Sequence, residues 1–190
     1  EKEDQTYATE EDLNKFSEAV PEQYMLGAGD VIEVLIRDRP DVSVKQTTVS
    51  PGGKISVPRI GIIDVKGMTI EEITEIIHSG MSKFYEDPEV TVHIHEHNNN
   101  KVYVLGRVAH PGLVKFGGPG TLIEALAECG GLPTVAEDAF LSRAVIFRGE
   151  DEVIWVDLRA VLEGGNVAMN PKLMNNDLIF IPESDDELIY

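Results

Sequence analysis

Cysteine is nearly absent from this chain of 190 residues, since Cys129 is the only one. A single cysteine excludes an internal disulfide and a cluster of thiolate metal ligands, so the redox compartment cannot be read from cysteine pairing. Leu122, Leu126 and Cys129 recur at helical spacing. We therefore expect Cys129 to be a small buried hydrophobic residue and not a nucleophile.

Basic and aromatic residues are also scarce. The chain holds 16 lysines and arginines against 34 aspartates and glutamates, which gives a net charge of -18, and aromatic residues make up 6%. Such a chain repels a phosphate backbone unless a local basic patch overcomes the field, and the basic residues are scattered singly. We expect no nucleic-acid partner. Trp155 is the only tryptophan, and a packing role or an interface role are both open for it.

Long apolar runs and catalytic motifs are missing as well. No run approaches the about 20 apolar residues of a membrane-spanning helix. The chain contains no G-x-S-x-G, no H-E-x-x-H and no phosphate-binding glycine fingerprint, and no nucleophile stands in a recognisable arrangement with a base. We predict that the protein is not an enzyme, with no catalytic residue and no cofactor.

The elements that the sequence does indicate alternate between strands and helices. Apolar alternation predicts strands at 31–36, 62–65, 90–97, 143–148, 152–157 and 178–182, and Pro51-Gly52-Gly53 predicts a hairpin turn between two β-rich stretches. Two segments follow helical spacing instead, and each begins with a capping box, Thr69 with Glu72 and Thr121 with Glu124. Gly130-Gly131 is expected to end the second helix.

Four segments follow from this pattern. Residues 1–21 are acidic with sparse apolar positions, and we expect a mobile or partner-docked arm. Asn98-Asn99-Asn100 separates a domain at 22–98 from a second at 99–184, before a tail at 185–190. An Asp lies one residue before an apolar run in each half, at Asp30 and Asp177. The predicted fold class is α+β, with two small β-rich domains that each carry one main helix.

Three histidines alternate in the stretch VTVHIHEH, at His93, His95 and His97. Alternation puts them on one face of a strand, which is a possible zinc arrangement if a further ligand joins them. A solvated polar face, or a face pressed against a neighbouring subunit, explains the same pattern. We predict no metal and keep these three residues as the candidate ligands.

Several turn motifs in this order resemble a known family. Tyr24-x-Leu26-x-x-Gly29-Asp30 followed by GGKISVPRIGIIDVKGMTIEE is similar to the export domain of the bacterial polysaccharide export proteins, the outer-membrane auxiliary family. VYVLGRVAHPGLVKF, TLIEALAECGGL and LMNNDLIFIP resemble the soluble-ligand-binding β-grasp (SLBB) domain that follows it. The resemblance implies that the second domain is β-grasp-like. The positions on the family motifs, which we expect to be chiefly structural, are Gly29, Asp30, Pro58, Gly61, Gly67, Gly106, Pro111, Gly112, Gly130, Gly131 and Asp177.

The resemblance implies a role in transport. Family members are periplasmic or outer-membrane lipoproteins that assemble as homo-oligomeric rings, and the ring is the route for capsular polysaccharide or exopolysaccharide. It also implies an inner-membrane polysaccharide co-polymerase as a partner. Larger members add further β-grasp repeats and a pore-lining helix, and the lipid-bearing cysteine of the family has no counterpart among these residues. The alternative function is a periplasmic or cell-surface β-grasp module that binds another ligand.

Overall fold

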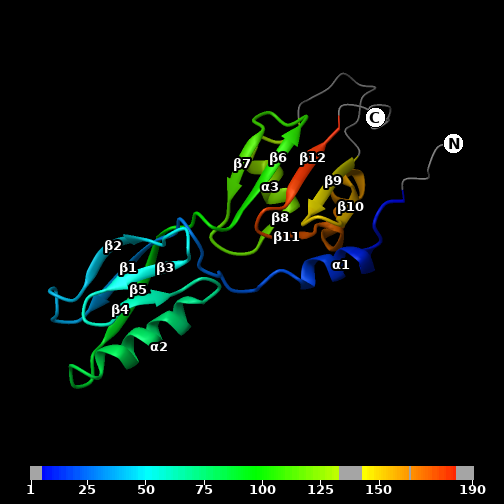
Figure 1. Ribbon diagram of the computed structural model, residues 1–190. Helices are drawn as coiled ribbons and strands as arrows, with labels where there is room; N and C mark the ends of the chain where they lie inside the picture. Colours follow the sequence, from blue (N-terminus) through cyan, green and yellow to red (C-terminus); the bar gives the residue numbers. More distant parts are fainter. Residues whose placement is uncertain (1–5, 133–142, 163, 183–190) are drawn as a thin grey trace. The chain divides into compact units, whose positions relative to one another are not determined.

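Two units make up the chain (Figure 1). The computed structural model describes residues 6–132, 143–162 and 164–182. Gln23–Asn100 form one unit, called here the central unit, and Glu1–Glu22 together with Lys101–Tyr190 form the other, called the composite unit. The fold class is α+β, as the sequence predicts.

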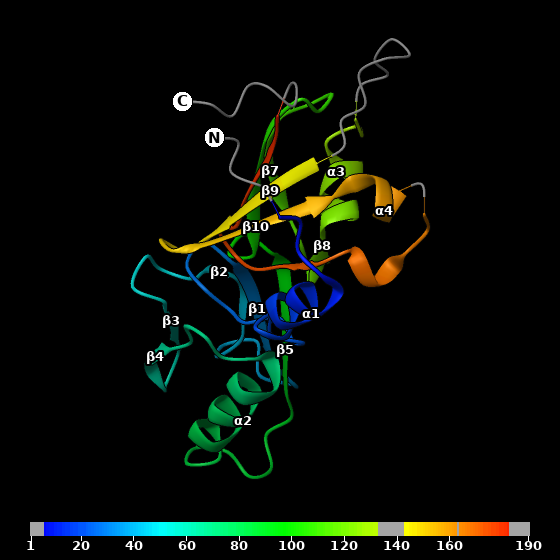
Figure 2. The same ribbon diagram turned by 90° about the vertical axis from the view of Figure 1, so that its right-hand side faces the viewer.

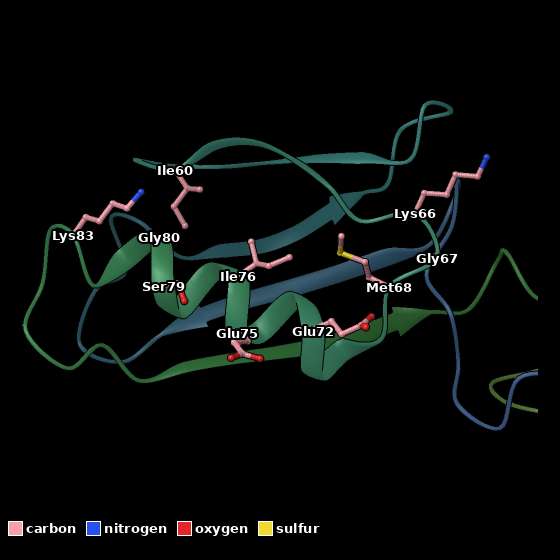
Figure 3. A pocket seen from close by; sticks show the side chains of 10 residues that line it. All are labelled: Ile60, Lys66, Gly67, Met68, Glu72, Glu75, Ile76, Ser79, Gly80 and Lys83. Carbon is pink, nitrogen blue, oxygen red and sulfur yellow. The ribbon is translucent and has the colours of Figure 1, made fainter.

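The central unit is built on a three-stranded antiparallel sheet in the order β2-β1-β5. The strands and the helix of this unit are β1 (Val31–Ile36), β2 (Val44–Thr48), β3 (Lys54–Val57), β4 (Gly61–Asp64), α2 (Ile70–Met81) and β5 (Val90–Glu96). Ile32 and Val34 of β1 and Val92 of β5 face the core, where Ile73 and Ile77 of α2 pack against them. Figure 3 shows α2 lying beside the β3–β4 hairpin.

Helix α2 begins where the sequence predicts. The Thr69 hydroxyl accepts a hydrogen bond from the Glu72 backbone N–H, and the Glu72 carboxylate accepts one from the Thr69 N–H at 2.9 Å. This pair satisfies two backbone donors that a helix start leaves without partners. Thr121 and Glu124 make the same box at α3 (Leu122–Glu128), so both predicted helix starts are confirmed.

The predicted turn at Pro51-Gly52-Gly53 is present, since the Ser50 N–H donates to the Lys54 carbonyl and the Gly53 N–H donates to the Ser50 carbonyl, but the predicted pairing of the two flanking strands as a hairpin is wrong. Strand β3 pairs with β4, with Ile55 opposite Ile63, while β2 pairs with β1. The Gly53 carbonyl instead accepts hydrogen bonds from the backbone of Val65 and Lys66. The turn therefore leads the chain out of one sheet and into another, because the partner of β3 follows it in the sequence.

The composite unit contains a five-stranded sheet in the order β10-β9-β12-β6-β7. Its elements after the central unit are β6 (Lys101–Gly106), β7 (Gly112–Lys115), β8 (Gly120–Thr121), α3, β9 (Arg143–Arg148), β10 (Glu152–Asp157), α4 (Leu158–Leu162), the 3-10 turn η1 (Val167–Met169), β11 (Lys172–Leu173) and β12 (Leu178–Ile181). The pairing of β12 with β6 is parallel and the other pairings of this sheet are antiparallel. Figure 2 shows α3 and α4 on one side of the sheet, where they cover its core.

The N-terminal segment differs from the expected arm. Glu10–Glu18 form helix α1, whose start is a third capping box between Thr9 and Asp12. Leu13 and Phe16 are 1% and 2% exposed and belong to the core of the composite unit. Sequence reasoning missed this helix because its apolar residues are few. Their spacing, three apart after a T-x-x-D box, was the signal that could have found it.

Candidate functional site

The carboxylate of Asp30 is fully buried and closes the central unit. It accepts hydrogen bonds from the Gly27 N–H at 2.9 Å, the Tyr24 hydroxyl at 2.7 Å, and the Asn98 and Asn99 N–H groups at 2.7 Å each. Backbone donors satisfy a buried carboxylate well, and hydrogen bonds to an ionised group are the stronger ones. One side chain thus ties the first residues of the unit to its last.

The Tyr24 hydroxyl responds to this setting. Burial, followed by the hydrogen bond that it donates to Asp30, raises the pKa of Tyr24 far above its ordinary value of 10.0. A second negative charge beside the carboxylate would be costly in a partly buried place, so Tyr24 stays neutral.

Asp177 occupies a similar position in the composite unit. Its carboxylate accepts from the Met174 N–H, three residues earlier, as Asp30 accepts from Gly27. It also accepts two bonds from Arg148, at 3.0 Å from Nε and 2.7 Å from Nη2. The pair is nearly inaccessible to water, with exposed side-chain fractions of 8% and 1%. The predicted echo between the two aspartates is therefore present in the structure.

Arg148 extends this arrangement to helix α1. Its guanidinium donates to the carbonyls of Phe16 and Lys172, and its central carbon lies 3.3 Å from the centre of the Phe16 ring. Arginine suits such a place because its planar fork can pair with a carboxylate and stack on an aromatic ring at once. Arg148 thus fixes α1 to the sheet.

The family-motif glycines lie in turns or at the ends of strands. The positions that adopt left-handed φ are Gly29, Gly61, Gly67, Gly106, Gly130 and Gly131. Gly106 has a second constraint, because a Cβ there would lie 2.0 Å from the Ile181 carbonyl oxygen. Pro58 lies in the β3–β4 turn, and Pro111 precedes Gly112 at the start of β7. These positions shape the backbone, and we keep a chiefly structural role for them as a proposal.

The three histidines do not converge. His93 lies opposite Glu33 in the β1–β5 ladder, and His95 places Nε2 3.4 Å from a Glu33 carboxylate oxygen. His97 instead packs against Tyr24, with ring centres 4.6 Å apart. Across the described ranges, the structure places no three His, Cys, Asp or Glu side chains closely enough to hold a metal ion. The histidines line an outer strand face and its end.

A groove of about 800 Å³ lies between α2 and the β3–β4 hairpin of the central unit (Figure 3). Ile60, Met68 and Ile76 give it an apolar floor, and Figure 3 shows Lys66 and Lys83 at its two ends. Helix and hairpin approach closely at Gly80, where a Cβ would lie 2.9 Å from Ile60. The groove can accept apolar side chains. Its lining holds the hydroxyl of Ser79 but no thiol and no histidine.

Cys129 is buried at the end of α3, as predicted. Burial, with a smaller effect of Glu128, raises the pKa of its thiol. A thiol that stays protonated and inaccessible is inert toward substrates.

In the part of the chain that the structure describes, no helix is both long and apolar enough to cross a membrane.

Comparison with known proteins identifies both units. The family model described as "Polysaccharide biosynthesis/export protein" matches residues 18–95, and the SLBB domain model matches residues 100–181. The boundary between the two matches falls where the central unit ends.

Individual relatives agree with these matches. The EPS I polysaccharide export outer membrane protein EpsA of Ralstonia nicotianae is 29% identical over 191 residues, which cover 88% of this chain and 49% of that protein. The exopolysaccharide production protein ExoF of Rhizobium meliloti is 26% identical over 175 residues, covering 85% of this chain and 41% of that protein. The chain spans about half the length of the curated relatives it matches. It belongs to the bacterial polysaccharide export proteins, with an export domain followed by an SLBB domain.

Proposed function

We propose that this chain is a non-enzymatic subunit of an oligomeric ring through which capsular polysaccharide or exopolysaccharide leaves the cell. The order of the export and SLBB matches over residues 18–181 carries the proposal. EpsA and ExoF align with 85–88% of the chain, and their names support the proposal. The corresponding location is the periplasm and the outer membrane, and the corresponding partner is an inner-membrane polysaccharide co-polymerase.

The chemistry of the described residues supports a scaffold. The carboxylates of Asp30 and Asp177 and the thiol of Cys129 are buried, and both carboxylates are hydrogen-bonded within their own units. A catalytic group must reach its substrate with a suitable proton donor or acceptor beside it. These three groups are committed to holding the fold.

Deletion of the gene in its host tests the export role. We expect polysaccharide to disappear from the medium and the cell surface while its sugar precursors continue to be made, and a plasmid copy should restore export. A central-unit variant that cannot fold, such as Ile73→Asp, should fail to restore it. Normal secretion in the deleted strain would contradict the proposal.

Mass measurement in solution and in mild detergent tests the ring. We expect an assembly of more than two chains. A strict monomer at high concentration would instead favour a β-grasp module that binds another ligand.

Incubation with anionic polysaccharide tests the absence of enzymatic activity, and measurable depolymerisation would overturn that part of the proposal.

A further inference from the structure

The face of the five-stranded sheet that points away from α3 and α4 is apolar across its whole width. The β-ladder pairs Val153 with Phe147, Phe147 with Leu178, Leu178 with Tyr103, and Tyr103 with Leu113. Directly paired residues share a face. These five residues, one from each strand, therefore form a continuous row.

A second row runs beside the first. Trp155 pairs with Val145, Val145 with Phe180, and Phe180 with Leu105. None of these side chains is charged, in a chain where 26% of residues are. We call the two rows together the outer apolar face.

The opposite face is already the core of the unit. Ile146, Ile179 and Val104 alternate with the outer residues and are fully buried. Strands that are apolar on both sides are typical of sheets covered on both faces, whereas a sheet with one wet face alternates apolar and polar residues. The sequence of these strands thus indicates that a second layer covers the outer apolar face.

The exposed area of this face is comparable with the apolar part of a standard interface. Five of its side chains remain 38–51% exposed, namely Tyr103, Leu105, Leu113, Phe147 and Val153. At about 200 Å² for a large side chain, they present about 400 Å² of apolar surface. Trp155, Leu178 and Phe180 are half-buried and add to it, whereas Val145 is already fully buried and the Arg143 guanidinium lies over the Trp155 ring. A standard interface takes about 800 Å² from each partner, and roughly 60% of that area is apolar. The apolar area of this face is therefore close to the apolar area that one partner contributes to such an interface.

We propose that the outer apolar face binds the same face of a second copy of this chain. Two such sheets would pack face to face at about 10 Å, like the layers of a β-sandwich. This pairing goes beyond the ring, because a two-fold contact closes on itself and joins only two chains.

Charge at the edges favours one orientation of the two copies. Lys101 and Lys115 are paired at the β6–β7 edge, and the acidic turn Glu150–Glu152 lies at the other edge, at the same end of the sheet. A two-fold axis parallel to the strands puts the β7 edge of one copy over the β10 edge of the other. The lysines of each copy then face the acidic turn of its partner, which gives specificity to the contact.

Mass photometry and sedimentation of the full chain test the pairing. We expect Phe147→Glu to halve the number of chains in the assembly, because each pair would bury two unpaired carboxylates. The matched control is Val167→Glu, since Val167 is apolar and 77% exposed but lies in η1 and outside the sheet. Its assembly should equal that of the wild type.

Three results would overturn the pairing. They are a wild-type chain that stays monomeric at about 100 µM, an assembly unchanged by Phe147→Glu, and an equal loss in Val167→Glu. A wild-type dimer that Phe147→Glu dissociates would support the pairing and contradict the ring, so the two proposals fail separately.

Cross-linking tests the orientation. Leu178 lies on β12, the middle strand of the sheet. A two-fold axis that lies between the two sheets, parallel to β12, places Leu178 of one copy opposite Leu178 of the other, and Leu113 opposite Val153. A bismaleimide that spans about 10 Å should link two copies of Leu178→Cys, and should link Leu113→Cys to Val153→Cys in a mixture. Leu113→Cys alone should link poorly. Efficient linking of Leu113→Cys to itself would overturn this orientation, and buried Cys129 keeps the background low.

Discussion

The smallest feature with a large effect is the Asp30 carboxylate. It accepts four hydrogen bonds from residues at both ends of the central unit. The side chain is fully buried, so water does not compete for these bonds. We expect Asp30→Asn to lower the free energy of unfolding of the central unit by about 3 kcal/mol, because the amide accepts fewer bonds and buries an unsatisfied donor. Urea denaturation measures this change.

Asp64→Asn is the matched control for Asp30→Asn. Asp64 is exposed in the same unit, so the same loss of charge should change stability by less than about 0.5 kcal/mol. Equal effects of the two substitutions would show that the hydrogen bonds of Asp30 add little.

Tyr24 makes the stability of the central unit sensitive to alkali. Its pKa is raised above 10.0 in the folded protein, so above about pH 10 the unfolded chain loses a proton that the folded chain keeps. Stability should be unaffected below that pH and should fall by up to about 1.4 kcal/mol for each pH unit above it.

Substitution isolates the contribution of this hydroxyl. Tyr24→Phe should abolish the alkaline part of the dependence, and Tyr103→Phe, at a partly exposed tyrosine of the other unit, should retain it. Denaturation curves at a series of alkaline pH values measure this dependence. A slope that persists in Tyr24→Phe would mean that another group titrates.

Helix α1 is the element whose role changes most when sequence and structure are compared. Phe16 is 2% exposed and stacks on Arg148, which is itself held by Asp177. We expect Phe16→Ala to destabilise the composite unit by about 3–4 kcal/mol, because it leaves a cavity and a half-covered guanidinium. Thermal unfolding followed by calorimetry measures the loss.

Phe84→Ala provides the comparison for Phe16→Ala. Phe84 is 49% exposed, so its removal should cost less than about 1 kcal/mol. If Phe16→Ala were equally mild, residues 10–18 would behave as the arm that the sequence suggests.

Local patterns predicted local elements well. Alternation and capping boxes predicted β1, β9, β10, α2 and the start of α3, because each depends on neighbours in the sequence. The partner of β3 and the docking of α1 could not be predicted, since both depend on residues far along the chain. The outer apolar face was hidden for the same reason. Its rows are visible only once the register brings Val153, Phe147, Leu178, Tyr103 and Leu113 together.

The net charge of -18 acts on the molecule as a whole. One interpretation is that this charge repels other copies of the chain and an acidic polymer, and so restrains assembly and binding of the polymer. The other is that it only keeps the surface of the protein solvated. If repulsion restrains assembly, raising the salt from about 0.05 M to about 0.5 M should increase the assembled fraction, because the screening length falls from more than about 10 Å to less than about 5 Å. Light scattering measures that fraction, and a salt-independent result would contradict the restraint.

The placement of α1 has a consequence for the order of folding. The composite unit begins at residues before Gln23 and resumes at Lys101, so the ribosome must deliver the whole central unit before α1 can meet β9. Joining the two parts across an unfolded segment of that length would cost about 4 kcal/mol of chain entropy. A central unit that has already folded, with Asp30 holding Tyr24 and Asn98 together, removes most of that cost. The buried carboxylate of Asp30 thus also acts during synthesis, because it holds the two ends of the central unit together and so brings the two parts of the composite unit near each other.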